Sequence, residues 1–187
     1  MRTSRFVVTA IAVVVAAGTA SAQSALEAPI AEKPALLTSV GQSADIEMAK
    51  VLLDRAGVPH KADAQVKAGA LAASGAKTLV VVVGGSTKGL GAAGISTDAE
   101  IDRAKALLAE AKRRGMAIIG VHIGGEARRG QLSDRFIEVA VPFCHYVVVV
   151  AEGDKDGFIT RLCGTSIPMD KVERMAKAVE PLRKAFK

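Results

Sequence analysis

The sequence predicts an α/β fold, a flavodoxin-like or Rossmann-like three-layer sandwich in which helices cover both faces of a parallel sheet of four or five strands. Two observations predict it. Short runs such as Thr78–Val83 and 116–123 are almost continuously apolar, as expected of strands that are buried on both faces. These runs alternate with amphipathic stretches of helical period, which is typical of repeated strand–helix units.

The first 22 residues have the three parts of a secretory signal peptide. Arg2 and Arg5 form a basic start, residues 6–17 are almost entirely apolar, and Ala-Ser-Ala at 20–22 offers small residues for cleavage. The apolar run has about a dozen residues, whereas a membrane-spanning helix needs roughly 20, so cleavage is favoured over an uncleaved anchor. We therefore expect a periplasmic or secreted protein with no membrane span after signal cleavage.

The mature chain has the length of one domain. Residues 23–34 contain two prolines and no regular period, which predicts a flexible lead-in, and residues 35–187 can form a single core. Without Arg2 and Arg5 the net charge falls from +6 to +4. This charge is mild, and the chain has one Tyr and no Trp, so nucleic-acid binding is not expected.

The first half of the domain predicts three strands and two helices. Ser43 can cap the first helix and Gly57 can end it. The apolar side of that helix is assigned to Ile46, Met48, Val51, Leu52 and Leu53. In chain order we expect a strand at Ala35–Val40, a helix at 43–56, a short edge strand at 58–61, a helix at 64–74 and a strand at Thr78–Val83.

The second half begins with the clearest helix, at 97–114, where Thr97 and Glu100 have the spacing of a capping box. Residues 157–163 are compatible with a helix or a hairpin arm, and their apolar residues favour the helix. The other expected elements are strands at 116–123 and 145–151, a helix at 133–141, a short strand from Ile167, and a terminal helix at 170–186 with a kink at Pro181.

Four predicted loops meet at the carboxyl edge of this sheet, namely 39–43, 84–94, 124–130 and 152–157. Ligands of such folds bind at this edge, near the point where the strand order reverses. The second loop holds five glycines and the third holds three; their exposed amides can hold an anion, and ordinary turn formation is the alternative. The candidate ligand-binding residues are Gln42, Ser43, Gly85, Ser86, Thr87, Lys88, Gly89, Gly125, Glu126, Arg128, Arg129, Asp154 and Asp156.

The charges of these loops have mixed signs. Lys88, Arg128 and Arg129 can bind a ligand carboxylate. The acidic residues Glu126, Asp154 and Asp156 would instead bind a ligand amine, pair with the basic side chains or hold Ca²⁺. Asp154 and Asp156 stand in a segment too short for an EF-hand loop. We therefore predict no metal site.

The glycine-rich segment 84–94 resembles three cofactor or catalytic motifs and completes none of them. The spacing of Gly89, Gly91 and Gly94 matches the dinucleotide fingerprint, but it lies too far beyond the strand and before the helix expected at Thr97. The lysine stands on the wrong side for a P-loop. A nucleophile elbow would need glycine where Lys88 stands. No cofactor is therefore expected.

Catalysis is left open by the sequence. His122 or Glu126 is the candidate base and Ser86 the candidate nucleophile. Cys144 and Cys163 are compatible with a disulfide in an oxidising compartment or with two buried free thiols.

Four segments, VGQSADIEMAKVLL, VVGGSTKGLGAAG, VHIGGEARRG and EGDKDGFIT, resemble a family of exported bacterial proteins of unknown function. The resemblance implies an exported α/β domain and assigns no activity. We expect a binding protein for a small polar or anionic ligand. The alternatives are an exported hydrolase or transferase that uses the same edge, and an accessory module that contacts a transporter or another envelope protein.

Overall fold

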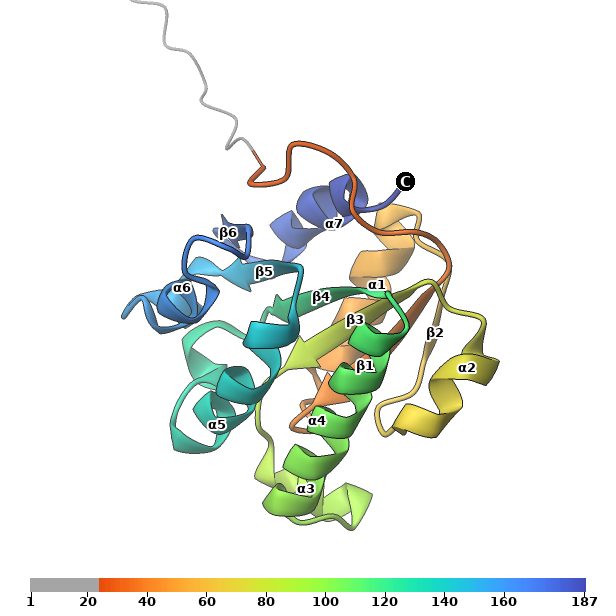
Figure 1. Ribbon diagram of the computed structural model, residues 1–187. Helices are drawn as coiled ribbons and strands as arrows, with labels where there is room; N and C mark the ends of the chain where they lie inside the picture. The colour runs from red at the N-terminus through yellow and green to blue at the C-terminus, as the bar shows by residue number, and fades with distance from the viewer. Residues whose placement is uncertain (1–23) are drawn as a thin grey trace, which may run out of the picture.

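The computed structural model describes residues 24–187, and a parallel six-stranded sheet forms its centre (Figure 1). The strand order is β2-β1-β3-β4-β5-β6. The strands are β1 (Ala35–Val40), β2 (His60–Ala62), β3 (Thr78–Val83), β4 (Ala117–His122), β5 (Tyr146–Val150) and β6 (Met169–Val172). The predicted α/β three-layer sandwich is confirmed, with six strands in place of four or five.

Helices cover both faces of the sheet, as the continuously apolar strands require (Figure 1). The helices are α1 (Asp45–Ala56), α2 (Leu71–Ser74), α3 (Thr87–Ala93), α4 (Thr97–Arg113), α5 (Gln131–Ala140), α6 (Phe158–Cys163) and α7 (Val179–Ala185). Helices α1 and α7 pack on one face, and the others contribute to the core on the opposite face. Successive valines of β3 therefore enter different cores, because side chains alternate along a strand.

The strand order reverses between β1 and β3. Strand β2 pairs with one side of β1 and β3 pairs with the other, in register from Ala35 opposite Thr78 to Val40 opposite Val83. The connections from β1 and β3 consequently leave on opposite faces, through α1 and α4. This reversal marks the edge at which open α/β sheets bind ligands.

Helix α1 has a narrower apolar face than the sequence predicted. Met48 and Val51 are 45% and 39% exposed, so their assignment to the apolar side was wrong. The buried stripe instead takes the small residues Ala49 and Ala56 together with Ile46, Leu52 and Leu53. This spacing follows the 3.6-residue period, which places Met48 and Val51 on the outer face.

Segment 84–94, which we expected to be a loop, contains helix α3. Ser86 caps this helix by accepting a hydrogen bond from the N–H of Gly89 at 3.0 Å. The glycine spacing of the dinucleotide fingerprint therefore lies within a helix and at its end. Segment 64–74 is less helical than the sequence predicted, since only η1 (Ala68–Ala70) and the single turn α2 are helical there.

The C-terminal segment 170–186 is not one kinked helix, so that prediction was wrong. It consists of the end of β6, the short η5 (Met175–Ala178), and α7. Pro181 lies in the first turn of α7, where a residue without an N–H group interrupts no helical hydrogen bond.

Residues 24–34 pack against the domain, although the sequence predicted a flexible lead-in. Ala31 is fully buried, and its N–H donates to the carbonyl of Ala185 at 2.9 Å. Asp170 accepts hydrogen bonds from the Ser24 hydroxyl and the Ala25 N–H. The predicted signal peptide lies outside the described residues, and no helix within 24–187 is long and apolar enough to span a membrane.

A buried ion pair joins α4 to the end of β1. Glu100 is fully buried, and its Oε2 lies 2.7 Å from Nε of Arg103. The Gly41 N–H donates to Oε1 of Glu100 at 2.9 Å, and Arg103 also donates to the carbonyls of Ser39 and Val66. Ser96, rather than Thr97, caps α4, which leaves Glu100 free for this role.

We predict that Glu100→Ala lowers the free energy of unfolding by about 3–5 kcal/mol, because removing one partner of a buried pair leaves the other charge unpaired. Urea denaturation measures this loss. Glu110→Ala is the matched control, since Glu110 pairs with Arg113 at the same spacing on the same helix while Arg113 is 70% exposed. Equal losses in the two variants would contradict the role assigned to Glu100.

Candidate functional site

The turn after β1 has an unusual backbone conformation. Gly41 and Gln42 have φ angles of 100° and 57°, and Gln42 is the one non-glycine residue of positive φ within residues 24–187. The Gln42 side chain donates from Nε2 to the carbonyl of Ala64 and to Oε1 of Glu100, both at 3.0 Å. The buried carboxylate of α4 therefore helps to hold a conformation that costs of order 1–3 kcal/mol.

The turn after β3 is hydrogen-bonded to the turn after β1. The N–H of Ser86 donates to the Gly41 carbonyl at 2.9 Å, and the Gly84 N–H donates to the Val40 carbonyl at 3.0 Å. Gln42 and Gly85 also form an isolated antiparallel bridge. These contacts bring the first two predicted loops together.

Several glycines at this edge allow close contact within the protein. A Cβ atom at any of five glycines would approach a neighbouring segment too closely to be accommodated in place. The five clashes are Gly41 with the Gly84 carbonyl, Gly85 with Leu132, Gly89 with the Gln42 carbonyl, Gly124 with Arg128 and Asp45, and Gly153 with the His122 ring. Packing within the protein thus accounts for these five glycines without a ligand.

A groove of about 690 Å³ opens beside the joined turns, and we call it the switch-point groove. The β1 turn, the first turn of α1, helix α3 and the segment after β2 form its walls. Its polar or charged lining residues are Gln42, Ser43, Glu47, Gln65, Ser86, Lys88 and Arg128. Ile46, Ala64, Ala92 and Ala93 supply apolar surface.

Two cations line the switch-point groove. Lys88 has no ion-pair partner within residues 24–187. Arg128 donates through Nε to both carboxylate oxygens of Asp45, each at 3.2 Å. Its two terminal nitrogens donate to no group of the described chain, so they remain available to another acceptor.

Arg129 is the centre of a second cluster at the same edge, away from the groove. Its guanidinium donates to Asp134, Asp156 and the Gly153 carbonyl, and it lies 4.8 Å from the Phe158 ring centroid. The hydrogen bond from Arg129 lowers the pKa of Asp156 to about 2. These charges are therefore already paired within the protein.

The remaining predicted acids also have partners in the chain. Asp154, in η4 (Ala151–Asp154), accepts from the backbone of Ile159 and from Thr160 at the start of α6, and it pairs with Lys171 at 2.8 Å. Burial opposes its charge, but these hydrogen bonds outweigh burial and lower its pKa. Glu126 pairs with Lys155 at 2.8 Å. Within residues 24–187 no three acidic, cysteine or histidine side chains form a metal-binding group.

Thr87 and Gly125 do not line the switch-point groove. Thr87 is the exposed first residue of α3, and Gly125 is buried in η2 (Gly125–Arg128), where its φ angle is 61°. The groove therefore contains Gln42, Ser43, Ser86, Lys88, Gly89 and Arg128 of the predicted residues. Gly85 lies in the adjoining turn and packs on Leu132.

His122, the candidate base, is 2% exposed at the end of β4. Nδ1 donates to the Val83 carbonyl at 2.9 Å, while Nε2 has no partner within residues 24–187. Burial lowers the pKa of His122, although the hydrogen bond to Val83 opposes this effect. The Ser86 hydroxyl accepts from Gly89 instead of meeting the imidazole, so the two do not form a nucleophile–base pair in the structure.

Cys144 and Cys163 are both free and buried, so the disulfide that the sequence left open is absent from the structure. Cys144 donates through Sγ to the Ala140 carbonyl at 3.4 Å. Burial raises the pKa of both thiols, that of Cys163 to about 11. The two side chains therefore act as small neutral groups of the core.

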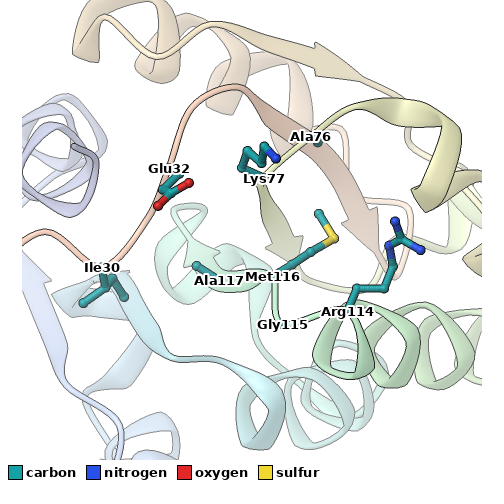
Figure 2. A pocket seen from close by; sticks show the side chains of 8 residues that line it. All are labelled: Ile30, Glu32, Ala76, Lys77, Arg114, Gly115, Met116 and Ala117. Carbon is teal, nitrogen blue, oxygen red and sulfur yellow. The ribbon is translucent and has the colours of Figure 1, made fainter.

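A second cavity, of about 300 Å³, lies at the amino edge of the sheet (Figure 2). Its charged side chains, from Glu32, Lys77 and Arg114, are all exposed. Oε1 of Glu32 lies 3.2 Å from Nζ of Lys187. This cavity is consequently a surface depression far from the strand-order reversal.

Sequence reasoning missed Glu100, Arg103, Asp45 and Ala64 as groups that shape the groove. One signal for Glu100 was present, since it continues the apolar stripe of Ala104, Leu107 and Ala111 on α4. A carboxylate on a buried stripe requires a partner, and Arg103 stands three residues away.

We predict that Gly89→Ala destabilises the protein and alters the groove, because the new methyl group would overlap the Gln42 carbonyl. Gly91→Ala is the matched control in the same helix, where a Cβ meets no neighbour within 4 Å. That control gains about 0.5–1 kcal/mol from helix propensity. Chemical denaturation of both variants tests this, and equal effects would contradict the packing assigned to Gly89.

We predict that protonation of His122 makes the protein less stable at acidic pH. Its folded-state pKa lies below the ordinary value of about 6.5, so the unfolded chain binds a proton that the folded chain excludes. The free energy of unfolding therefore falls as pH drops below about 6.5 towards the folded-state pKa. Asn at position 122 cannot titrate and retains a donor for Val83, so His122→Asn should lose less stability between pH 7 and 5 in urea titrations. Identical losses would contradict this assignment.

The sequence also relates this chain to a known protein family. A comparison with curated proteins finds no match. Residues 32–186 match the family described as a domain of unknown function, DUF6305. This match spans the sheet, both helical layers and the switch-point groove, so the chain belongs to the DUF6305 family.

Proposed function

We propose that this chain is an exported small-molecule binding protein that holds a small organic anion in the switch-point groove. The observation that carries the proposal is a groove of about 690 Å³, at the strand-order reversal, lined by Lys88 and Arg128. Its volume falls within the usual range of ligand sites, about 300–1,000 Å³. Export rests on the signal peptide expected in residues 1–22, and it allows a transporter or another envelope protein as a partner.

Two cations and one acid line the groove, and the carboxylate of that acid, Glu47, is paired with Lys50 at 2.9 Å. Arg128 meets Asp45 through Nε only, which leaves its terminal nitrogens for a ligand carboxylate. Lys88 adds a second positive charge. Arginine binds carboxylates with two parallel hydrogen bonds, so it also orients them.

The other half of the edge fits this proposal less well. Hydrogen bonds and ion pairs within the protein already satisfy the charged groups of Arg129, Asp156 and Asp154. A ligand there would have to displace these contacts. We therefore restrict the proposed site to the groove and leave Glu126, Arg129, Asp154 and Asp156 outside it.

We predict that small carboxylates, screened by thermal shift with hexanoate and succinate as first probes, raise the melting temperature of the mature protein. A ligand at a hundred times its Kd stabilises by about 2.7 kcal/mol. Lys88→Ala and Arg128→Ala should each abolish the shift. Unchanged shifts in both variants would refute the site.

Two controls separate charge at the groove from general effects. Lys105→Ala removes an exposed lysine of α4 that does not line the groove, so the ligand-induced shift should persist. Asp45→Asn removes the acid that competes for Arg128, so affinity should be retained or increased. Loss of binding in Asp45→Asn would indicate that Arg128 acts only through its ion pair.

A further inference from the structure

We infer that the groove selects organic acids that also carry a hydrogen-bond donor, a hydroxyl or an amine, and that Oε1 of Gln42 recognises this donor. The inference rests on the proposed function, because it assigns a ligand class to the same groove. It depends on a different group, however, since Gln42 is neutral and makes no contribution to the attraction of an anion.

The amide of Gln42 is fixed in one orientation. Nε2 donates to the Glu100 carboxylate and to the Ala64 carbonyl, both at 3.0 Å. Both partners are acceptors, so only the NH₂ end of the amide can face them. The carbonyl oxygen Oε1 must therefore point away from this pair.

Oε1 is an acceptor without a donor in the described chain. Gln42 is 8% exposed, yet Oε1 is absent from the fully buried polar atoms that lack a partner, which are Ser39 Oγ and His122 Nε2. Oε1 thus reaches the surface, and Gln42 lines the groove. We therefore assign to Oε1 the role of the fixed acceptor for a ligand in the groove.

The backbone at Gln42 is held in a strained conformation. Gln42 has a φ angle of 57°, a strained conformation for a residue with a side chain. Glycine would adopt it without strain, and glycine already occupies the preceding position, Gly41. The hydrogen bonds from Nε2 to Glu100 and Ala64 account for the side chain at this position, and they also fix the direction of Oε1.

The rest of the groove defines the body of the ligand. Ile46, Ala64, Ala92 and Ala93 give the groove its apolar surface. The ligand class is therefore an acid with a short aliphatic body and a hydroxyl or amino substituent. A ligand that lacks this donor would leave Oε1 without its partner and would bind less tightly.

The test compares matched acids on the intact mature protein. Isothermal titration would measure hexanoate against 2-, 4- and 6-hydroxyhexanoate, which place the donor at different distances from the carboxylate. We expect at least one hydroxy acid to bind about fivefold tighter than hexanoate, the gain from one hydrogen bond. Equal affinities for all four acids would overturn this inference and leave the proposed function standing. Binding of none would overturn both.

Gln42→Met removes the acceptor Oε1 together with the Nε2 donor to Glu100 and Ala64, so the quantity to compare is the ratio of the affinities for the hydroxy acid and for hexanoate. We expect this ratio to fall to about one in the variant, whatever its affinity for hexanoate. Circular dichroism melting establishes that it folds. A retained preference in folded Gln42→Met would overturn the role of Gln42.

Discussion

The carboxylate of Glu100 is the interaction on which the carboxyl edge depends. It lies in a fully buried position of α4, where an unpaired charge would be strongly unfavourable, and Arg103 neutralises it. The same carboxylate accepts hydrogen bonds from Gly41 and Gln42. A helix that packs on one face of the sheet thereby fixes the turn at the end of β1.

This arrangement joins the parts of the carboxyl edge to one another. The β1 turn is bonded to the β3 turn, and Gly89 lets α3 approach the Gln42 carbonyl closely. The groove is consequently lined by residues of α1 and α3 and by turns that are hydrogen-bonded to each other and to α4. Binding to such a surface avoids most of the entropy that ordering a loop would cost.

The sequence was sufficient to predict the positions of the central strands. It was insufficient to predict helix α3 or which charged side chains pair with one another. The valines of β3 and β5 are buried whichever helix covers them, so local pattern defined these strands to within a residue or two. Helix α3 holds Gly89 and Gly91, which lower helix propensity, and it is stabilised by the Ser86 cap and tertiary contact. Arg128 and Arg129 are adjacent and chemically identical in sequence. In the structure Arg129 donates to Asp134, Asp156 and the Gly153 carbonyl, whereas the terminal nitrogens of Arg128 have no acceptor in the described chain. Only the spatial positions of Asp45, Asp134 and Asp156 distinguish them.

The difference between the two halves of the edge follows from topology. At β4 and β5 the successive turns lie side by side, and contacts between η2 and η4, with Arg129 bonded to Gly153 and Asp156, close the surface. Between β1 and β3 the chain leaves on opposite faces, so α1 and α3–α4 diverge, and the groove opens beside the hydrogen-bonded β1 and β3 turns. The groove is thus a consequence of the strand-order reversal. Its charge is a property of this sequence, which places Lys88 and Arg128 on the walls and leaves them incompletely neutralised.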